Sequence, residues 1–317
     1  MDAHAAERAR VEKHKKQGYK PNEISPQANF VISLLLTLLT LVFILPVLLV
    51  IVVSFSTPES LTHRGYSLIP ESWTLTTYKY LFQSGRQILD SYKVTIARTV
   101  IGPLISLAVM SLYSFVIAYR SFPARKFYTY FLFISSIFSG GMVASFIVNV
   151  RYLGLYDNFL IYILPTAISW FNVIILRTFI QTTIPDSLFE AAKIDGAGDF
   201  RIFFQIVLPL FKAGLATIGL FCVVGQWNEW TTALLYIDNP KLVPIQTMLQ
   251  RIQNNINFIK NNAQMSGTQE EQQILNSLPT ESAQMAITVI ATVPILCVYP
   301  FFQKYFIKGM TIGSVKG

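Results

Sequence analysis

One segment of the chain, residues 185–209, carries polar and charged residues at the spacing of a folded interaction site. Asp186 or Ser187 can cap a first helix, and Ser187 with Glu190 fits the capping box, in which a carboxylate pairs back to the cap residue. Gly196 then provides a residue that accepts the left-handed conformation in which many helices end. The segment therefore predicts a helix that ends in a sharp turn.

A second helix is expected after this turn. Asp199 can cap it, Pro209 ends it, and Phe200, Phe203 and Phe204 form an aromatic stripe along it. We expect part of the stripe to pack against the chain's own helix ends. The remaining apolar surface should not be left in water, so we interpret the helix–turn–helix as a docking element for another protein.

The residue types do not favour catalysis. Cys222 and Cys297 each lie in an apolar run far from the three histidines, which excludes a disulfide framework and a zinc site. The sequence contains no G-x-x-x-x-G-K-[ST] phosphate loop. This chain is therefore not expected to bind ATP through such a loop or to be an enzyme.

The composition indicates that these residues belong to a membrane protein. Of 317 residues, 52% are hydrophobic and 13% are charged, and the mean hydropathy is +0.47. An ordinary soluble domain has about 25% charged residues, so the apolar excess is expected to face lipid. The net charge of +8 comes from Lys and Arg in tails and loops, which fits an anionic membrane surface better than nucleic acid.

Six apolar stretches are long enough to cross a hydrocarbon core of about 30 Å, which takes about 20 residues. They cover residues 29–53, 94–119, 127–150, 158–180, 213–237 and 282–302. The third is the weakest, because Ser139, Gly140 and Gly141 interrupt it. The expected fold class is an all-α membrane protein with six transmembrane helices.

The distribution of basic residues predicts the orientation of these helices. With a cytoplasmic N-terminus, the inner segments hold sixteen Lys and Arg residues and the outer segments hold seven. Both termini are therefore expected in the cytoplasm. The expected layout is a basic tail at 1–28, a transmembrane domain at 29–302, a tail at 303–317, outer loops at 54–92 and 237–281, and an inner loop at 181–212.

The inner loop resembles a motif of a known family. The spacing Glu190-Ala191-Ala192, three residues, Gly196, nine residues, Ile206-x-Leu208-Pro209 is similar to the EAA loop of ABC-importer permease subunits. In that family the loop forms the coupling helices that sit in a cleft of the ATPase subunit. The resemblance implies a type I ABC importer permease fold with these ATPase-coupling residues: Glu190, Ala191, Ala192, Asp195, Gly196, Phe200, Leu208 and Pro209.

Other segments are similar to the maltose-type and complex-oligosaccharide permeases. The C-terminal tail, 303–317, resembles one that reaches into the interface between the two ATPase subunits. The resemblance implies that the outer loop at 237–281 contacts the solute-binding protein. The tail residues that it implies to touch the ATPase are Thr311, Ile312, Gly313 and Lys316.

The fifth apolar stretch contains a charged residue, Glu229, in a run that also resembles sugar permeases of this type. A charge within a membrane segment is a functional hypothesis by default. Glu229 is expected near the outer interface, where Trp227 and Trp230 would form an aromatic belt. Asn228 and Glu229 are therefore expected to form an outer gate or a structural pair, with direct sugar contact as the less favoured alternative. Arg98, near the outer end of the second stretch, is expected to snorkel to the interface.

The resemblance implies the permease subunit of an ATP-driven importer for oligosaccharides or complex glycans in a bacterial cell membrane. The implied partners are a second homologous permease, two ATPase subunits that bind ATP and Mg, an extracellular solute-binding protein and the lipid bilayer. No cofactor in this chain and no nucleic-acid partner are expected. A stand-alone secondary transporter or channel is the alternative, although paired intramembrane charges and an internal repeat are not evident. A membrane enzyme ranks third.

Overall fold

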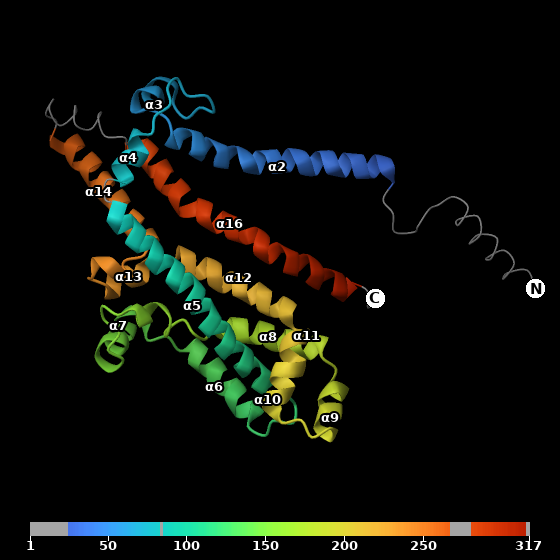
Figure 1. Ribbon diagram of the computed structural model, residues 1–317. Helices are drawn as coiled ribbons and strands as arrows, with labels where there is room; N and C mark the ends of the chain where they lie inside the picture. Colours follow the sequence, from blue (N-terminus) through green and yellow to red (C-terminus); the bar gives the residue numbers. More distant parts are fainter. Residues whose placement is uncertain (1–24, 83–84, 267–279, 315–317) are drawn as a thin grey trace, which may run out of the picture.

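The structure is a computed structural model that describes residues 25–82, 85–266 and 280–314. Helices joined by turns and loops make up these residues, together with one isolated antiparallel bridge between Ser56 and Trp73. Three long helices dominate the molecule: α2 (Pro26–Ser54), α5 (Gly85–Ala118) and α16 (Thr280–Ser314). Figure 1 shows α2 and α16 along one side, while α5 runs toward the end of the molecule that carries α9 and α10. The prediction of an all-α membrane fold is confirmed.

These three helices are each long and apolar enough to cross a membrane, and they correspond to the first, second and sixth expected spans. Only 6% of the most apolar window of α2 is buried. Its main neighbour is α16, and its Leu, Val and Ile side chains otherwise point outward. Such a helix is stable in lipid, where exposed apolar side chains cost nothing. Helix α16 also continues past the expected end of the sixth span at residue 302.

The third expected span, 127–150, is not one helix. It consists of α6 (Arg125–Ile137), α7 (Gly141–Ile147) and the π-helix η1 (Val148–Tyr152), with a bend of 114° between α6 and α7. The φ of Gly141 is +76°, a left-handed conformation that glycine adopts without a steric penalty. The glycine pair therefore breaks the span sharply, and the prediction of a continuous helix is corrected.

The fourth expected span, 158–180, is helical over only part of its length. It begins with the 3₁₀-helix η2 (Phe159–Tyr162) and continues with α8 (Trp170–Thr183). Helix α8 has 14 residues and is therefore about 21 Å long, shorter than a hydrocarbon core. Residues 163–169 between them form no helix, since Pro165 lacks an N–H and disfavours helical backbone at the preceding residue.

The fifth expected span, 213–237, is interrupted at Glu229 and Trp230. A bend of 79° also separates its main helix, α12, from the helical segment that precedes it. If each of the two bent pairs is counted as one span, the described residues contain up to five spans. The elements here are α10 (Asp199–Ile202), η3 (Phe203–Val207), α11 (Leu208–Leu210), α12 (Lys212–Asn228) and α13 (Thr231–Tyr236).

Buried apolar side chains form two clusters at opposite ends of α5. The first includes Ile88 and Val94 and packs against α13, α14 (Ile245–Ser266) and α16. The second includes Met110 and Phe115 and packs against α8, α9 (Asp186–Ile194) and η3. Between the clusters α5 buries polar residues, among them Arg98. Three short elements complete the described chain: α3 (Pro58–Arg64), α4 (Thr76–Phe82) and η4 (Pro240–Leu242).

Candidate functional site

The first candidate site is the predicted docking loop, and its first helix is α9. Pro185 is the residue that precedes the helix, and no side chain caps it. The prediction that Asp186 or Ser187 caps α9, with Glu190 closing a capping box, is therefore wrong. The reason is that Ile184 and Pro185 are both extended, so the helix begins immediately after the proline. The exposed carboxylate of Glu190 has no hydrogen-bond partner within the described part of the chain.

The turn after α9 is built on Gly196, whose φ of +74° is left-handed. Its N–H donates to the carbonyl of Lys193 at 3.0 Å, and the N–H of Ala197 donates to the carbonyl of Ala192 at 2.9 Å. These two hydrogen bonds form the Schellman motif, which satisfies carbonyls at a helix end. The predicted left-handed turn at Gly196 is confirmed.

An ion pair joins the two helices across this turn. Gly198, and not Asp199, is the cap residue of α10. The carboxylate of Asp199 lies 2.8 Å from Lys193 Nζ, so this side chain forms an ion pair with α9. The prediction that Asp199 caps the second helix is therefore wrong. The hydrogen bond with Asp199 raises the pKa of Lys193, so the ammonium stays charged at neutral pH. Because both side chains are exposed, the pair fixes geometry more than it adds stability.

Buried side chains anchor the loop to the transmembrane helices. Phe189 and Ala192 of α9, and Ile202 and Phe203 after the turn, belong to the same apolar cluster as Phe115 of α5. The ring centroids of Phe115 and Phe203 are 5.4 Å apart. The expectation that part of the aromatic stripe packs internally is confirmed for Phe203. The loop is thus a preformed unit that is fixed to α5.

The outer surface of the loop is apolar. Ile194 is 86% exposed, Phe200 77% and Phe204 54%. Ile194 is not among the predicted ATPase-coupling residues. Its position could have been recognised from the sequence, because it is an apolar residue between Lys193 and Asp195 at the end of a short helix. Of the predicted coupling residues, Ala192 is buried and Leu208 half-buried. The others are exposed, namely Glu190, Ala191, Asp195, Gly196, Phe200 and Pro209.

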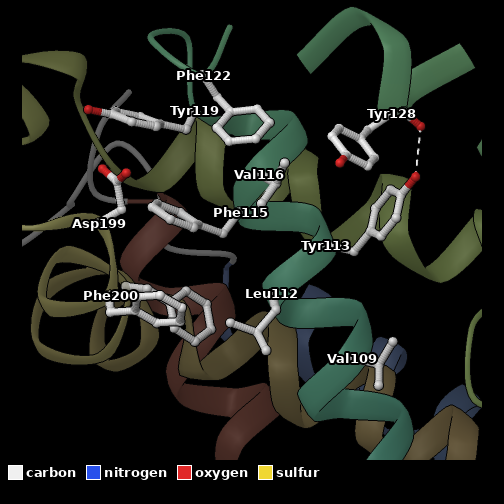
Figure 2. A pocket seen from close by; sticks show the side chains of 11 residues that line it. Val109, Leu112, Tyr113, Phe115, Val116, Tyr119, Phe122, Tyr128, Asp199 and Phe200 are labelled. Atoms are coloured by element: carbon white, nitrogen blue, oxygen red, sulfur yellow. Dashed lines mark hydrogen bonds between the residues drawn. The ribbon is translucent and has the colours of Figure 1, made fainter. Parts of the chain in front are cut away.

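Two hollows flank the loop. One, of about 570 Å³, lies between α5 and α10 and is mostly apolar, with Leu112, Phe115 and Phe200 on its walls (Figure 2). The other, of about 440 Å³, is lined by Glu190 and Ile194 together with the 2.9 Å ion pair of Arg120 and Asp186. The loop therefore offers a partner protein apolar surface beside an unpaired carboxylate.

The second candidate site lies at the break between α12 and α13, where α5 contributes Arg98. Its side chain is only 1% exposed, so the prediction that it snorkels is wrong. The reason is that α5 already begins at Gly85, which places Arg98 deep in the helix. Its Nη2 donates to the carbonyl oxygens of Gln226 and Glu229, at 2.5 and 3.0 Å, and lies 3.4 Å from Glu229 Oε2. The cation therefore satisfies carbonyls at the C-terminal end of α12.

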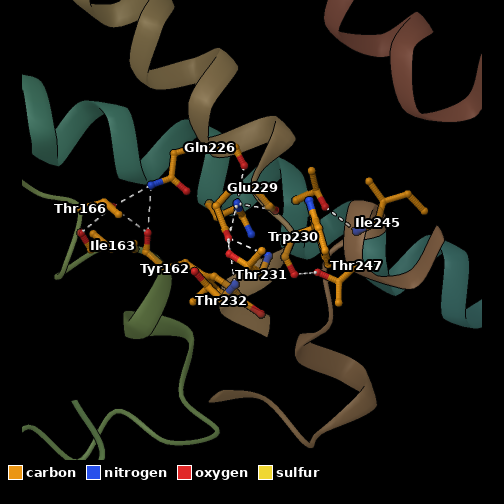
Figure 3. Close-up of polar contacts among 12 residues, drawn as sticks. Tyr162, Ile163, Thr166, Gln226, Glu229, Trp230, Thr231, Thr232, Ile245 and Thr247 are labelled. Atoms are coloured by element: carbon orange, nitrogen blue, oxygen red, sulfur yellow. Dashed lines mark hydrogen bonds and ion pairs between the residues drawn. The ribbon is translucent and has the colours of Figure 1, made fainter. Parts of the chain in front are cut away.

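Glu229 fixes the other side of the break (Figure 3). Its Oε1 accepts hydrogen bonds from the N–H and Oγ1 of Thr231, at 2.7 and 2.6 Å, and from the N–H of Thr232 at 2.8 Å. The carboxylate thereby satisfies free donors at the start of α13. Asn228 is exposed beside it. One acidic residue and one arginine thus join the ends of two helices to α5.

Trp227 does not belong to an aromatic belt. It is only 5% exposed, and its Nε1 donates to the carbonyl of Ala291 in α16 at 2.9 Å. The predicted belt is therefore wrong for Trp227, because α16 packs over this face of α12. Trp230 is 38% exposed.

The predicted tail site lies partly within the described chain. Thr311, Ile312 and Gly313 are among the last residues of α16, so the backbone remains helical up to this point. Lys316 lies outside the described residues.

Comparisons with known proteins agree with this architecture. Residues 110–312 match the family described as binding-protein-dependent transport system inner membrane component. The chain is 41% identical over 282 residues to the polygalacturonan/rhamnogalacturonan transport system permease protein YtcP of Bacillus subtilis strain 168, covering 89% of this chain and 96% of that protein. It is 40% identical over 275 residues to protein LplC of the same strain, covering 86% and 90%.

Among solved structures, the chain is similar to a bacterial ABC transporter involved in the import of the acidic polysaccharide alginate. The TM-score is 0.72 and the sequence identity 28%, over 88% of this chain and 96% of the other.

Proposed function

Because this chain belongs to the family of binding-protein-dependent transport system inner membrane components, we propose specific roles for its loop, its helix break and its tail within an ABC importer. The chain is the permease subunit of an importer for oligosaccharides or complex glycans. A stand-alone secondary transporter or channel is not favoured. The subunit transports and is not itself the ATPase, and ATP with Mg is bound by partner subunits.

The sugar class follows from the relatives. One is named for polygalacturonan and rhamnogalacturonan transport, and the similar solved structure imports alginate. We infer that this chain carries oligosaccharides derived from glycans of this kind. Its identity of 41% with the polygalacturonan/rhamnogalacturonan transport system permease protein supports this class.

The α9–turn–α10 unit is proposed to couple transport to ATP hydrolysis. The observation that carries this proposal is its combination of a fixed, buried base with an exposed outer surface that includes Glu190, Ile194 and Phe200. A preformed apolar surface next to an unpaired carboxylate suits a cleft that has basic and apolar walls. When the ATPase subunits close on ATP, the docked loop moves with them, and the spans change between inward-facing and outward-facing states.

The remaining partners follow from the same assembly. A second homologous permease supplies the other half of the translocation path, and two ATPase subunits bind the coupling loops. An extracellular solute-binding protein delivers the sugar and contacts residues 237–281, which include α14. Asn228 and Glu229 form part of an outer gate, and Thr311, Ile312, Gly313 and Lys316 contact the ATPase subunits.

The orientation in the cell membrane is proposed from the distribution of charge. Sixteen basic residues on the inner segments against seven on the outer ones support cytoplasmic termini and a cytoplasmic coupling loop. The outer segments then include α3 and α14.

The substitution Glu190→Lys tests the coupling role. It reverses the charge that the loop offers to the ATPase and disturbs no contact within the described chain, since Glu190 is exposed and unpaired there. In the complete transporter reconstituted in liposomes, sugar-stimulated ATP hydrolysis is expected to fall about tenfold, the cost of replacing one attractive charge contact by a repulsive one. Membrane insertion should be unchanged.

Glu59→Lys is the matched control. It makes the same charge reversal at an exposed position of α3, on the side proposed to face away from the ATPase. This variant should hydrolyse ATP like the wild type. If Glu190→Lys also does so, the docking assignment is wrong.

A further inference from the structure

A cavity of about 290 Å³, lined in part by polar side chains, lies beside the break between α12 and α13. Its walls come from α5, from the segment between η2 and α8 with the start of α8, and from the two helices at the break. Its volume is at the lower end of the about 300–1,000 Å³ that ligand pockets span. The polar residues that line it are Ser106, Thr166, Asn172, Gln226, Glu229 and Thr232.

The cavity lies where the backbone of two expected spans is not helical. Residues 163–169 form no helix, and α12 stops at Asn228. Within a bilayer, such backbone is tolerated only where protein buries it or where it lines a water-filled cavity. In transporters, discontinuous helices of this kind form substrate sites near the middle of the membrane. The polar side chains in its lining suit a path for solute better than a surface that faces lipid.

The amide of Gln226 has a defined orientation at this cavity. Its Nε2 donates to the carbonyl oxygen of Tyr162 and to Oγ1 of Thr166, both at 2.9 Å. A carbonyl oxygen can only accept a hydrogen bond, so the nitrogen must face Tyr162 and the amide oxygen must face away, as in Figure 3. Among the described residues, no donor pairs with that oxygen. It remains an acceptor for a ligand.

Two more lining residues have free hydrogen-bonding capacity. The side chain of Asn172 is half-buried and makes no hydrogen bond to any part of the chain that the structure describes. The Oε2 of Glu229 has one long contact, at 3.4 Å to Arg98. The side-chain amide of Asn172 can donate and accept hydrogen bonds. The amide oxygen of Gln226 and the Oε2 of Glu229 can only accept them. A sugar hydroxyl both donates and accepts, so a ring with neighbouring hydroxyls matches this set.

The charges that line the cavity also restrict the chemical class of its ligand. Its lining includes the carboxylate of Glu229 and no cation, since Arg98 is buried behind it and paired with it. The ion pair carries no net charge, so these groups suit the neutral hydroxyls of a sugar ring and offer no free cation to a sugar carboxylate. We propose that this cavity is a contact site for the hydroxyl groups of a sugar ring as an oligosaccharide crosses the membrane. The proposal rests on the function proposed above and adds to it the residues that touch the sugar.

Gly225 allows the cavity to be filled without disturbing the helix. It lines the cavity, and a Cβ built on it meets nothing within 4 Å. Gly225→Leu therefore places a side chain in the cavity while α12 stays intact. Val224→Leu is the matched control, because the neighbouring residue is exposed and does not line the cavity. Asn172→Leu provides a second test, since it keeps the side chain's size and removes the groups that can donate and accept hydrogen bonds.

The experiment uses the complete transporter in liposomes, with its solute-binding protein, and three probes: a malto-oligosaccharide, an oligogalacturonate and a rhamnogalacturonan oligosaccharide. Asn172→Leu is expected to lower uptake of the transported probe about tenfold, the effect of losing one good hydrogen bond. Gly225→Leu is expected to lower uptake as well, because its side chain occupies the cavity. ATP hydrolysis stimulated by the binding protein should stay at the wild-type level, and Val224→Leu should match the wild type in both assays.

Unchanged uptake by both variants would overturn the proposal. A parallel fall in uptake and ATP hydrolysis would also overturn it, because it would give the cavity a purely structural role. If the wild-type transporter takes up none of the three probes, the proposed function fails first and this inference fails with it.

Discussion

Arg98 shows how strongly a single residue can depend on its surroundings. The side chain of Arg98 is 1% exposed. A buried guanidinium needs hydrogen-bond acceptors and an opposite charge to compensate for the loss of its hydration. It has two carbonyls, the carboxylate of Glu229 and the ring of Tyr162, whose centroid lies 4.8 Å from the guanidinium carbon. Arg98 therefore serves as the connection between α5 and the break that separates α12 from α13.

Replacing Arg98 by Met should destabilise the transporter. The substitution keeps much of the side chain's volume but leaves the carbonyls of Gln226 and Glu229 without their donor, which costs about 3 kcal/mol for a buried pair that loses one partner. The midpoint of thermal unfolding in detergent is expected to fall by several degrees.

Lys93→Met on the same helix is the control for Arg98→Met. Lys93 pairs with Asp90 at 2.9 Å, but its side chain is 76% exposed, so its loss should leave the unfolding midpoint unchanged. Equal midpoints for the two variants would contradict the role assigned to Arg98.

At the scale of elements, interruptions distinguish this molecule from a simple helical bundle. The sharp bend at Gly141, the irregular segment before α8 and the gap between α12 and α13 all fall within expected spans. The gap and the irregular segment adjoin the cavity that Gln226 and Glu229 line. The α9–turn–α10 unit depends in the same way on local backbone geometry, here the left-handed turn at Gly196.

The turn at Gly196 can be tested by graded substitution. Gly196→Ala should lower sugar-stimulated ATP hydrolysis partially, because a Cβ in the left-handed region costs about 1–2 kcal/mol. Gly196→Pro should abolish it, since proline cannot adopt a φ of +74° and removes the N–H that donates to Lys193. Both variants should still insert into the membrane.

Gly198→Ala is the matched control for this turn. Gly198 has a φ of −72°, which any residue adopts, and a Cβ added there meets nothing within 4 Å. Wild-type hydrolysis is expected from this variant. Wild-type hydrolysis from Gly196→Pro as well would show that the turn does not transmit the ATPase movement.

At the scale of the whole molecule, the two apolar clusters hold the two ends of α5, and the buried polar residues of α5, such as Arg98, lie between them. One end carries the coupling loop, and the other adjoins α14 and the start of α16. Helix α2 lies along α16 with its apolar side chains outward. Under the proposed function, the end that carries α9 and α10 faces the ATPase subunits and the end near α14 faces the solute-binding protein.

This arrangement predicts which residues are reachable from outside the cell. After replacement of Cys222 and Cys297 by Ser, single cysteines at Thr62 of α3 and Asn255 of α14 should react with an impermeant thiol reagent on intact cells. A cysteine at Ser187 of α9 should not react until the membrane is opened, because the distribution of basic residues favours a cytoplasmic position for this loop. All three positions are exposed. Labelling at Ser187 from outside would invert the proposed topology.

Much of the architecture could be predicted from local sequence. The apolar stretches indicated a membrane protein, because their length and lack of charge leave lipid as the only suitable surroundings. The left-handed turn at Gly196 could also be predicted, since its geometry depends on adjacent residues alone. The helix caps could not be predicted. Pro185 sets where α9 begins, and Asp199 pairs with Lys193 and does not cap the second helix.

The sequence by itself determined the membrane class, the approximate spans and the left-handed turn at Gly196, because each depends on the composition and backbone preferences of neighbouring residues. Only the tertiary structure decided that Arg98 is buried, that Glu229 joins two helices to α5 and that Trp227 is covered by α16. Arg98 and Glu229 are 131 residues apart in the chain. The physical reason is that burial and pairing of a polar side chain depend on which helix lies opposite it, and packing across the whole chain sets that neighbour.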